Sequence, residues 1–312
     1  MAAAHWPLDA SVIVCTRNRA AALRQTLAAL SAMCVPDTVR HEVIVIDNAS
    51  SDDTRSVVEA AAAGMPVSYC YEGQPGAGHA RNTGLAQAMG RLIFVTDDDC
   101  VVSPDWLETG IRLLTDNPRQ VIGGRVELHD PRDLPITIKT ETKPTQLATV
   151  ISVFGFIHGC NMILGRCVLD EVGLFDPLLG PGTRCRAADD ADLVYRAFRA
   201  GVPVRYAPEL RVAHDHGRRD KADGARLMRG YMVSKGAMAC KHLLGGRLDL
   251  LKPMYWDLRA NARDRGPRLL PDYLAGALAY LRSLREHGEP PTTSSSARSK
   301  QASVGPGVRS AG

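Results

Sequence analysis

The sequence predicts an α/β protein built on a mostly parallel sheet with helices on both faces. Four short apolar runs rich in Val and Ile alternate with three segments of helical periodicity between residues 10 and 97. Strands of a parallel sheet are buried on both faces, so they read as continuous apolar runs. Because each return to a parallel strand needs a crossover, strict alternation of strand and helix indicates this architecture.

The predicted elements follow one another closely in this first third of the chain. The expected strands cover residues 10–16, 41–47, 66–72 and 91–97. The expected helices cover residues 19–33, 54–63 and 78–90. The first helix is predicted from apolar residues at helical spacing, namely Leu23, Leu27, Leu30 and Met33.

The pattern is looser beyond residue 100, and we expect a second half of mixed elements. Here the predicted elements are a strand over 119–128, a loop or lid over 130–150, a strand, turn and short helix over 150–176, a loop and helix over 182–201, and a strand pair over 202–216. Helical segments follow to about residue 288. The Ser-, Pro- and Gly-rich tail, residues 289–312, is expected to be disordered.

The composition is that of an ordinary globular protein, with 45% hydrophobic and 23% charged residues. A net charge of +4 is too small to suggest nucleic-acid binding, so we expect no nucleic-acid partner. The charge is uneven, because 14 Lys and Arg stand against 6 Asp and Glu between residues 211 and 268. This basic region fits an anionic substrate, an anionic membrane surface, or simply a solvated helical face.

The eight cysteines are scattered, and their spacing matches no zinc site or disulfide framework. Reduced thiols of this kind are typical of the cytosol. We therefore expect a cytoplasmic protein, either free or peripheral at the inner face of the cell membrane.

Three of the predicted strands end in polar or charged residues: Thr16-Arg17-Asn18, Asp47, and Asp97-Asp98-Asp99. Ligands of open α/β sheets bind at the carboxyl ends of the strands. Three adjacent carboxylates repel one another. Burying each of them without a cationic partner would cost roughly several kcal/mol, which is the usual penalty for a buried charge. Mg²⁺ or Mn²⁺ would supply the cation, and both share their coordination shell with substrate phosphates. The pattern therefore predicts a metal-bound nucleoside diphosphate, although Asp47 could also cap the next helix.

Four landmarks resemble the inverting glycosyltransferases of family two, which have the GT-A fold. In order they are "SVIVCTRNR", "EVIVIDNASSDDT", "GAGHARNTG" with "FVTDDDC", and the stretch from "HGCNMIL" to "RVAHDH". The resemblance covers about residues 10–216 and implies a GT-A, Rossmann-like sheet. It implies a glycosyltransferase domain over 1–216, divided into a nucleotide-sugar half (about 8–100) and an acceptor half (about 101–216). A helical extension over 217–288 and the tail would follow.

The resemblance also implies roles for individual residues. It assigns nucleotide-sugar binding to Thr16, Arg17, Asp47, Arg81, Asp97 and Asp98. It assigns metal or diphosphate contacts to Asp97, Asp99 and His214. It assigns the acceptor side to Gly159, Cys160, Asn161 and Asp189, with Asp190 as the catalytic base. Two motifs depart from the family pattern, because Cys15-Thr16-Arg17-Asn18 replaces Pro-Thr-Tyr-Asn and Asp189-Asp190 replaces Glu-Asp.

The implied activity is metal-dependent transfer of a hexose or deoxyhexose to a hydroxyl of a glycan or glycolipid, with inversion. The donor base, uridine or deoxythymidine, stays open. One alternative is a non-catalytic scaffold of the same fold. Another is a sugar nucleotidyltransferase, because "GPGTR" (residues 180–184) is similar to a phosphate loop. The "GQPGAG" stretch lacks the spacing of a dinucleotide-binding loop.

Residues 267–285 carry leucines at helical spacing: Leu270, Leu274, Leu278 and Leu281. Arginines flank them at Arg268, Arg282 and Arg285. Such a helix can lie on a membrane surface with its apolar face down. The alternative is that this face packs on the catalytic domain.

Overall fold

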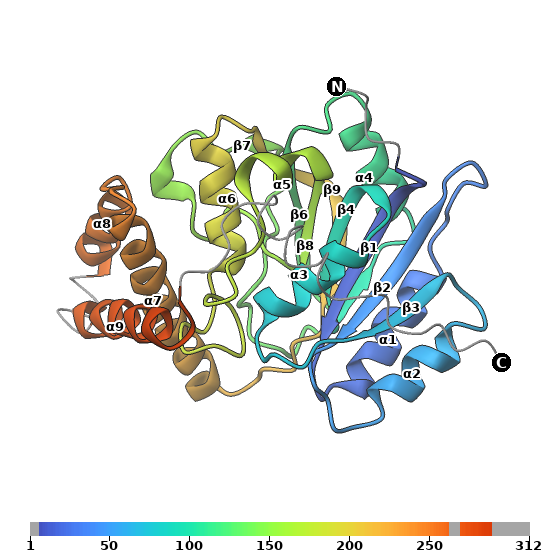
Figure 1. The fold of residues 1–312 in the computed structure, drawn as a ribbon, viewed down its shortest axis with the longest axis horizontal. Helices are drawn as coiled ribbons and strands as arrows, with labels where there is room; N and C mark the ends of the chain where they lie inside the picture. The colour runs from blue at the N-terminus through green and yellow to red at the C-terminus, as the bar shows by residue number, and fades with distance from the viewer. Residues whose placement is uncertain (1–5, 262–268, 289–312) are drawn as a thin grey trace.

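The computed structural model describes residues 6–261 and 269–288, so the tail expected to be disordered lies outside the described residues. A mixed sheet forms the centre, with strand order β3-β2-β1-β4-β8-β6-β9-β5 and β7 paired with β9 (Figure 1). The strands are β1 (Leu8–Thr16), β2 (His41–Asp47), β3 (Val67–Tyr71), β4 (Gly90–Asp97), β5 (Cys100–Val102), β6 (Val121–Leu128), β7 (Thr145–Gln146), β8 (Asn161–Gly165) and β9 (Val204–His214). The predicted fold class, a mostly parallel sheet with flanking helices and C-terminal helices, is confirmed.

Helices cover both faces of this sheet. They are α1 (Ala20–Ser31), α2 (Thr54–Ala61), α3 (Ala77–Gln87), α4 (Trp106–Thr115), α5 (Arg166–Val172), α6 (Asp189–Arg199), α7 (Lys221–Leu244), α8 (Leu251–Asn261) and α9 (Leu269–His287), with a 3₁₀ turn η1 at Val150–Ser152. Successive strand residues point to opposite faces. Accordingly Ile13 packs in the core cluster that holds α3, whereas Val12 and Val14 pack in the cluster that holds α1 and α2.

The first four strands are parallel, as their sequence pattern predicted. The second half departs from the expectation in two places. The stretch 202–216 contains one long strand, β9, rather than a strand pair, and β9 runs parallel to β6 with a register shift between Gly124 and Arg125. The strand expected near residue 150 begins only at Asn161, and β8 pairs antiparallel with both β4 and β6. These antiparallel pairings join segments far apart in the chain, which a local pattern cannot encode.

Helices α7, α8 and α9 gather at one end of the molecule, away from α1 and α2 (Figure 1). Helices α7 and α9 approach closely where each carries a glycine. A Cβ on Gly236 would lie 2.1 Å from the carbonyl oxygen of Tyr273, and one on Gly276 would lie 1.8 Å from that of Val233. Only glycine fits at this crossing, so the two helices pack backbone against backbone.

Three of the four leucines predicted as a stripe on α9 are exposed, and the fourth, Leu281, is half-buried. Leu270, Leu274 and Leu278 are 48%, 56% and 53% exposed, whereas Tyr273 and Tyr280 on the same helix are buried. No helix among the described residues is long and apolar enough to cross a membrane.

A buried ionic cluster joins the C-terminal helices to α6. The fully buried Asp192 carboxylate lies 2.8 Å from Arg196 Nε and 2.8 Å from Lys241 Nζ, and it accepts a hydrogen bond of 2.7 Å from His242 Nε2. Lys241 also lies 2.9 Å from Asp176, so it bridges two carboxylates. Burial alone would raise the pKa of Asp192, but the neighbouring cations hold it well below its usual range.

We expect Asp192→Asn to lower the free energy of unfolding by about 3–5 kcal/mol, because it leaves buried cations uncompensated. Urea denaturation measures this loss. The exposed Asp170 on α5 provides the control, since Asp170→Asn removes the same charge without burial. The depressed pKa also sets the pH dependence. The stabilisation by Asp192 is present above its unfolded pKa, about 3.9, and is lost as the pH falls below that value. Equal stability of the two variants at neutral pH would contradict this account.

Candidate active site

The polar ends of three neighbouring strands meet at one edge of the sheet. In the parallel register, Thr16 of β1 lies beside Asp47 of β2, and Cys15 lies beside Asp97 of β4. Asp98 and Asp99 then form a turn into β5, which pairs with β9 so that Cys100 lies opposite His214. This pairing brings His214 Nε2 to 3.3 Å from Asp99 Oδ1.

Each of the three adjacent carboxylates has a cationic partner from elsewhere in the chain. Arg81 Nη2 lies 3.2 Å from Asp97 Oδ1. Arg19 reaches two carboxylates at once, with Nη1 3.0 Å from Asp98 Oδ1 and Nη2 2.8 Å from Asp99 Oδ2. These pairs offset the mutual repulsion of the triplet within the protein itself.

These contacts shift the pKa values of the site in opposite directions. Burial alone would lower the pKa of His214, but the Asp99 carboxylate raises it to about 9. Burial opposes the ionisation of Asp99, yet the hydrogen bond from His214 and the charges of His214 and Arg19 lower its pKa to about 2. Burial raises the pKa of Asp98 to about 7, against the opposing effects of Arg19 and of the Thr16 hydroxyl, which donates to Asp98 at 2.7 Å.

Arg81 connects the end of β4 to the start of α6. Its side chain is only 6% exposed, and besides Asp97 it pairs with Asp189, the first residue of α6. The next residue, Asp190, is half-buried, and its Oδ2 accepts a hydrogen bond of 2.9 Å from the backbone N–H of Gly159. A Cβ on Gly159 would lie 3.3 Å from both Arg81 Nη2 and Asp190, so the three residues are in close contact.

Asp99 and His214 have the chemistry of a divalent metal site. One ligand atom each from Asp99, Cys100 and His214 lie within 4.8 Å of one another. The carboxylate oxygen of Asp99 is the kind of ligand that Mg²⁺ and Mn²⁺ favour, and the imidazole nitrogen of His214 is a common metal ligand. The hydrogen bond with Cys160, together with burial, raises the pKa of the Cys100 thiol well above its usual value, so this side chain stays protonated. The site residues therefore fit a metal held by Asp99 and His214, with the half-exposed Asp97 beside it.

Other residues expected at the site have different surroundings. Asp47 is buried, and it accepts hydrogen bonds from Ser50 N and Tyr69 Oη, both at 2.8 Å. Arg17 is exposed, and Cys160 is buried. Asn161, which the resemblance assigned to the acceptor side, is fully buried.

The amide of Asn161 is committed to the sheet. It accepts from the indole N–H of Trp106 at 2.9 Å and donates to the carbonyl oxygens of Arg125 and Leu210 at 2.9 and 3.0 Å. These bonds satisfy the amide and hold β8 against the irregular pairing of β6 and β9. Its role in the structure is therefore to connect β8 to the neighbouring strands and to α4.

Three residues near the site were missed by the sequence analysis. Arg19 was quoted within the first motif, but its reach to Asp98 and Asp99 has no local signal. Burial lowers the pKa of His158, and the charge of Asp190 opposes this shift. Tyr231 comes from α7, outside the stretch that resembles the family. Burial raises its pKa to about 12, and the charge of Asp190 adds to this shift.

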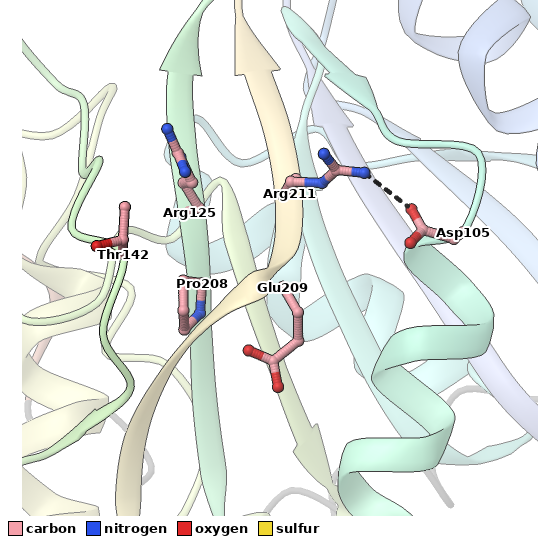
Figure 2. A pocket seen from close by; sticks show the side chains of 6 residues that line it. All are labelled: Asp105, Arg125, Thr142, Pro208, Glu209 and Arg211. Carbon is pink, nitrogen blue, oxygen red and sulfur yellow. Dashed lines mark ion pairs between the residues drawn. The ribbon is translucent and has the colours of Figure 1, made fainter.

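A separate pocket of about 380 Å³ lies over β6 and β9, between the loop that carries Thr142 and the start of α4 (Figure 2). Its lining has mixed charge and consists of Asp105, Arg125, Thr142, Pro208, Glu209 and Arg211. Arg211 lies 3.7 Å from Asp105, and Arg125 lies 2.7 Å from Glu127. None of the strand-end residues lines this pocket, so it is distinct from the candidate site.

Comparison with known proteins gives relatives of one family. The model of the family described as glycosyl transferase family 2 matches residues 11–173. The glycosyltransferase AglE of Haloferax volcanii is 26% identical over 235 residues, which cover 72% of each chain. The pre-mycofactocin glycosyltransferase of Mycobacterium tuberculosis is 25% identical over 242 residues. That match covers 75% of this chain but only 48% of the relative.

Two solved structures have the same fold. TarS of S. aureus (residues 1–349) matches with a TM-score of 0.59 and 17% identity, over 86% of this chain and 81% of that one. The mannosyltransferase PcManGT of Pyrobaculum calidifontis, in complex with GDP-Man and Mn²⁺, matches with a TM-score of 0.56 and 18% identity, over 96% and 83%.

Proposed function

This chain belongs to glycosyltransferase family 2, and we propose that it transfers a hexose or deoxyhexose from a nucleoside-diphosphate donor to a hydroxyl of a glycan or glycolipid. The reaction is a metal-dependent single displacement with inversion. One observation carries the proposal. Arg81 pairs with Asp97 at the end of β4 and with Asp189 at the start of α6, which supports one site shared by the carboxylate triplet and Asp190.

On the donor side, Asp99 and His214 would hold Mg²⁺ or Mn²⁺. When bound, such an ion neutralises the charge that grows on the leaving diphosphate. The mannosyltransferase with the same fold is in complex with GDP-Man and Mn²⁺, which supports a metal-bound donor here. Thr16 ends β1, Arg17 follows it and Asp47 ends the adjacent strand β2, so we assign these three residues to the nucleoside end of the donor.

On the acceptor side, the two carboxylates of the acidic pair have different surroundings. Asp189 is buried and its carboxylate is paired with Arg81, so it is less suited to accept a proton. Asp190 is more exposed, and the N–H of Gly159 orients its carboxylate. Asp190 would take the proton of the acceptor hydroxyl as that oxygen attacks the anomeric carbon opposite the diphosphate. A single attack of this kind inverts the anomeric configuration. A non-catalytic scaffold would be expected to lack one of these groups, yet both Asp99 and Asp190 are present.

We propose that residues 217–288 act with the catalytic domain (1–216) rather than as an independent unit. Lys241 and His242 of α7 contact Asp192, two residues beyond the proposed base on the same helix. Tyr231, from the same helix, lies within the electrostatic influence of Asp190. The C-terminal helices therefore support the acceptor side.

We also propose that α9 touches an anionic membrane surface while the enzyme acts on its acceptor. Its exposed leucines lie four residues apart on one side of the helix, and Trp256 and Tyr255 of α8 are also exposed. Arg282 and Arg285 lie near the end of the helix and are exposed. Apolar residues flanked by arginine suit the boundary between headgroups and acyl chains.

The metal assignment predicts that Asp99→Ala abolishes transfer while the protein remains folded, because the ligand of the ion is lost. It also predicts that EDTA inhibits the wild type. The measurement is release of nucleoside diphosphate from a panel of UDP-, dTDP- and GDP-sugars with acceptor and Mn²⁺. Asp116→Ala, an exposed carboxylate at the end of α4, is the matched control and should be fully active. Undiminished turnover in EDTA would refute the metal requirement.

The base assignment predicts that Asp190→Asn keeps donor affinity but loses about 10²–10⁴-fold in transfer rate. Donor binding is measured by calorimetry, and the anomeric configuration of the wild-type product by NMR. Asp189→Asn separates the two roles. It should lower the thermal stability, because buried Arg81 loses a partner. Retention of configuration, or a fully active Asp190→Asn, would overturn the mechanism.

The membrane contact predicts that replacing Leu270, Leu274 and Leu278 together with Glu abolishes binding to vesicles that contain anionic lipid. The new charges would be forced towards the acyl chains, where they are costly. Co-sedimentation with vesicles, with and without the anionic lipid, measures the effect. Met89→Glu, at another exposed apolar position, should bind as the wild type does. Equal recovery of wild type and triple variant would exclude this surface.

A further inference from the structure

Arg19 covers the buried carboxylates of Asp98 and Asp99 from the solvent side. It is the residue before α1, and its side chain is 42% exposed, whereas those of Asp98 and Asp99 are 5% and 4% exposed. Each of its two terminal nitrogens contacts one carboxylate, at 3.0 and 2.8 Å. The positively charged guanidinium therefore lies between the solvent and the carboxylates that would hold a metal.

The remaining oxygens of these carboxylates already have partners. Asp98 Oδ2 accepts from the Thr16 hydroxyl at 2.7 Å, and Asp99 Oδ1 lies 3.3 Å from His214 Nε2. Asp99 Oδ2, the oxygen paired with Arg19, is therefore the one that a metal would approach from solvent. A divalent cation there and the guanidinium would be a few ångströms apart and would repel each other.

We propose that Arg19 is a displaceable counter-ion, which occupies the place of the metal at Asp99 and leaves when the metal-bound donor enters. This inference rests on the proposed metal-dependent function. It gives the site two alternating cations, because Arg19 neutralises the carboxylates in the free enzyme and the ion does so in the complex. The metal then binds weakly alone and better with the nucleotide, whose diphosphate offers the released guanidinium a new anionic partner.

The contrast with Arg81 shows why Arg19 can move. The Arg81 side chain is 6% exposed and holds carboxylates from both halves of the domain, so its release would break the core of the site. Arg19 reaches its carboxylates from the surface, and both of them belong to the same turn. Its withdrawal would leave the backbone of α1 and of that turn in place.

The test is the affinity of the folded protein for Mn²⁺ alone, without nucleotide, measured from the electron paramagnetic resonance signal of free Mn²⁺. Removing the competing charge should make Arg19→Ala bind Mn²⁺ about tenfold more tightly than the wild type does. Arg19→Gln should do the same, and Arg19→Lys, which keeps the charge, should stay close to the wild type. Arg24→Ala, an exposed arginine on the same helix, is the matched control and should change nothing.

Thermal unfolding gives a second readout that does not depend on activity. In EDTA, Arg19→Ala should unfold at a lower temperature than the wild type, because two buried carboxylates lose their cation. Saturating Mn²⁺ should raise its unfolding temperature by more than it raises that of the wild type. Arg19→Ala with unchanged or weaker Mn²⁺ affinity would overturn the inference.

Asp99→Ala separates this inference from the proposed function. If the wild type binds Mn²⁺, Asp99→Ala does not, and Arg19→Ala binds it as the wild type does, the metal site stands and the counter-ion role fails. If neither the wild type nor Arg19→Ala binds Mn²⁺, even with UDP, dTDP or GDP present, the metal site and this inference both fall.

Discussion

The neutralisation of three consecutive carboxylates is the constraint on which the site depends. Asp97, Asp98 and Asp99 come at the end of a buried strand, where an unpaired charge would be costly. Their protein cations come from the start of α1, from α3 and from the last residue of β9. These segments are far apart in the sequence, so the triplet fixes their relative positions. Stability and the proposed ligand recognition thus depend on the same charges.

Ion pairs also hold the proposed acceptor side in place. The helix α6 is held near its start, where Asp189 pairs with Arg81, and one turn later, where Asp192 contacts Lys241 and His242 of α7. Asp190 lies between these two anchors, and its carboxylate is turned towards Gly159. A catalytic base is most effective when it is already held in position, because no conformational entropy is then lost during the reaction. The C-terminal helices contribute to this order, although they lie outside the stretch that carries the family motifs.

The sequence predicted the parallel strands and the helices between them, because local apolar patterns encode both. It also predicted that the ends of these strands would form the site. It did not predict the antiparallel place of β8 or the single strand β9, since their pairing depends on contacts distant in the chain. Asn161 shows the limit for side chains. Its position in a motif suggested a ligand contact, but the surrounding backbone carbonyls and Trp106 use its amide completely. Arg19 was equally hidden, because its partners lie about eighty residues away.

Two arginines solve the same electrostatic problem in different ways, and the difference follows from burial. Arg81 is buried and pairs with both Asp97 and Asp189. Moving it would leave both carboxylates without their cationic partner. Arg19 is half-exposed and serves a single turn, so water or another cation can replace it at lower cost. In the proposed mechanism the site holds a metal ion only part of the time, and this requires one cation of each kind. The fixed arginine would keep the carboxylates in place, and the exposed one would keep them neutralised until the donor binds.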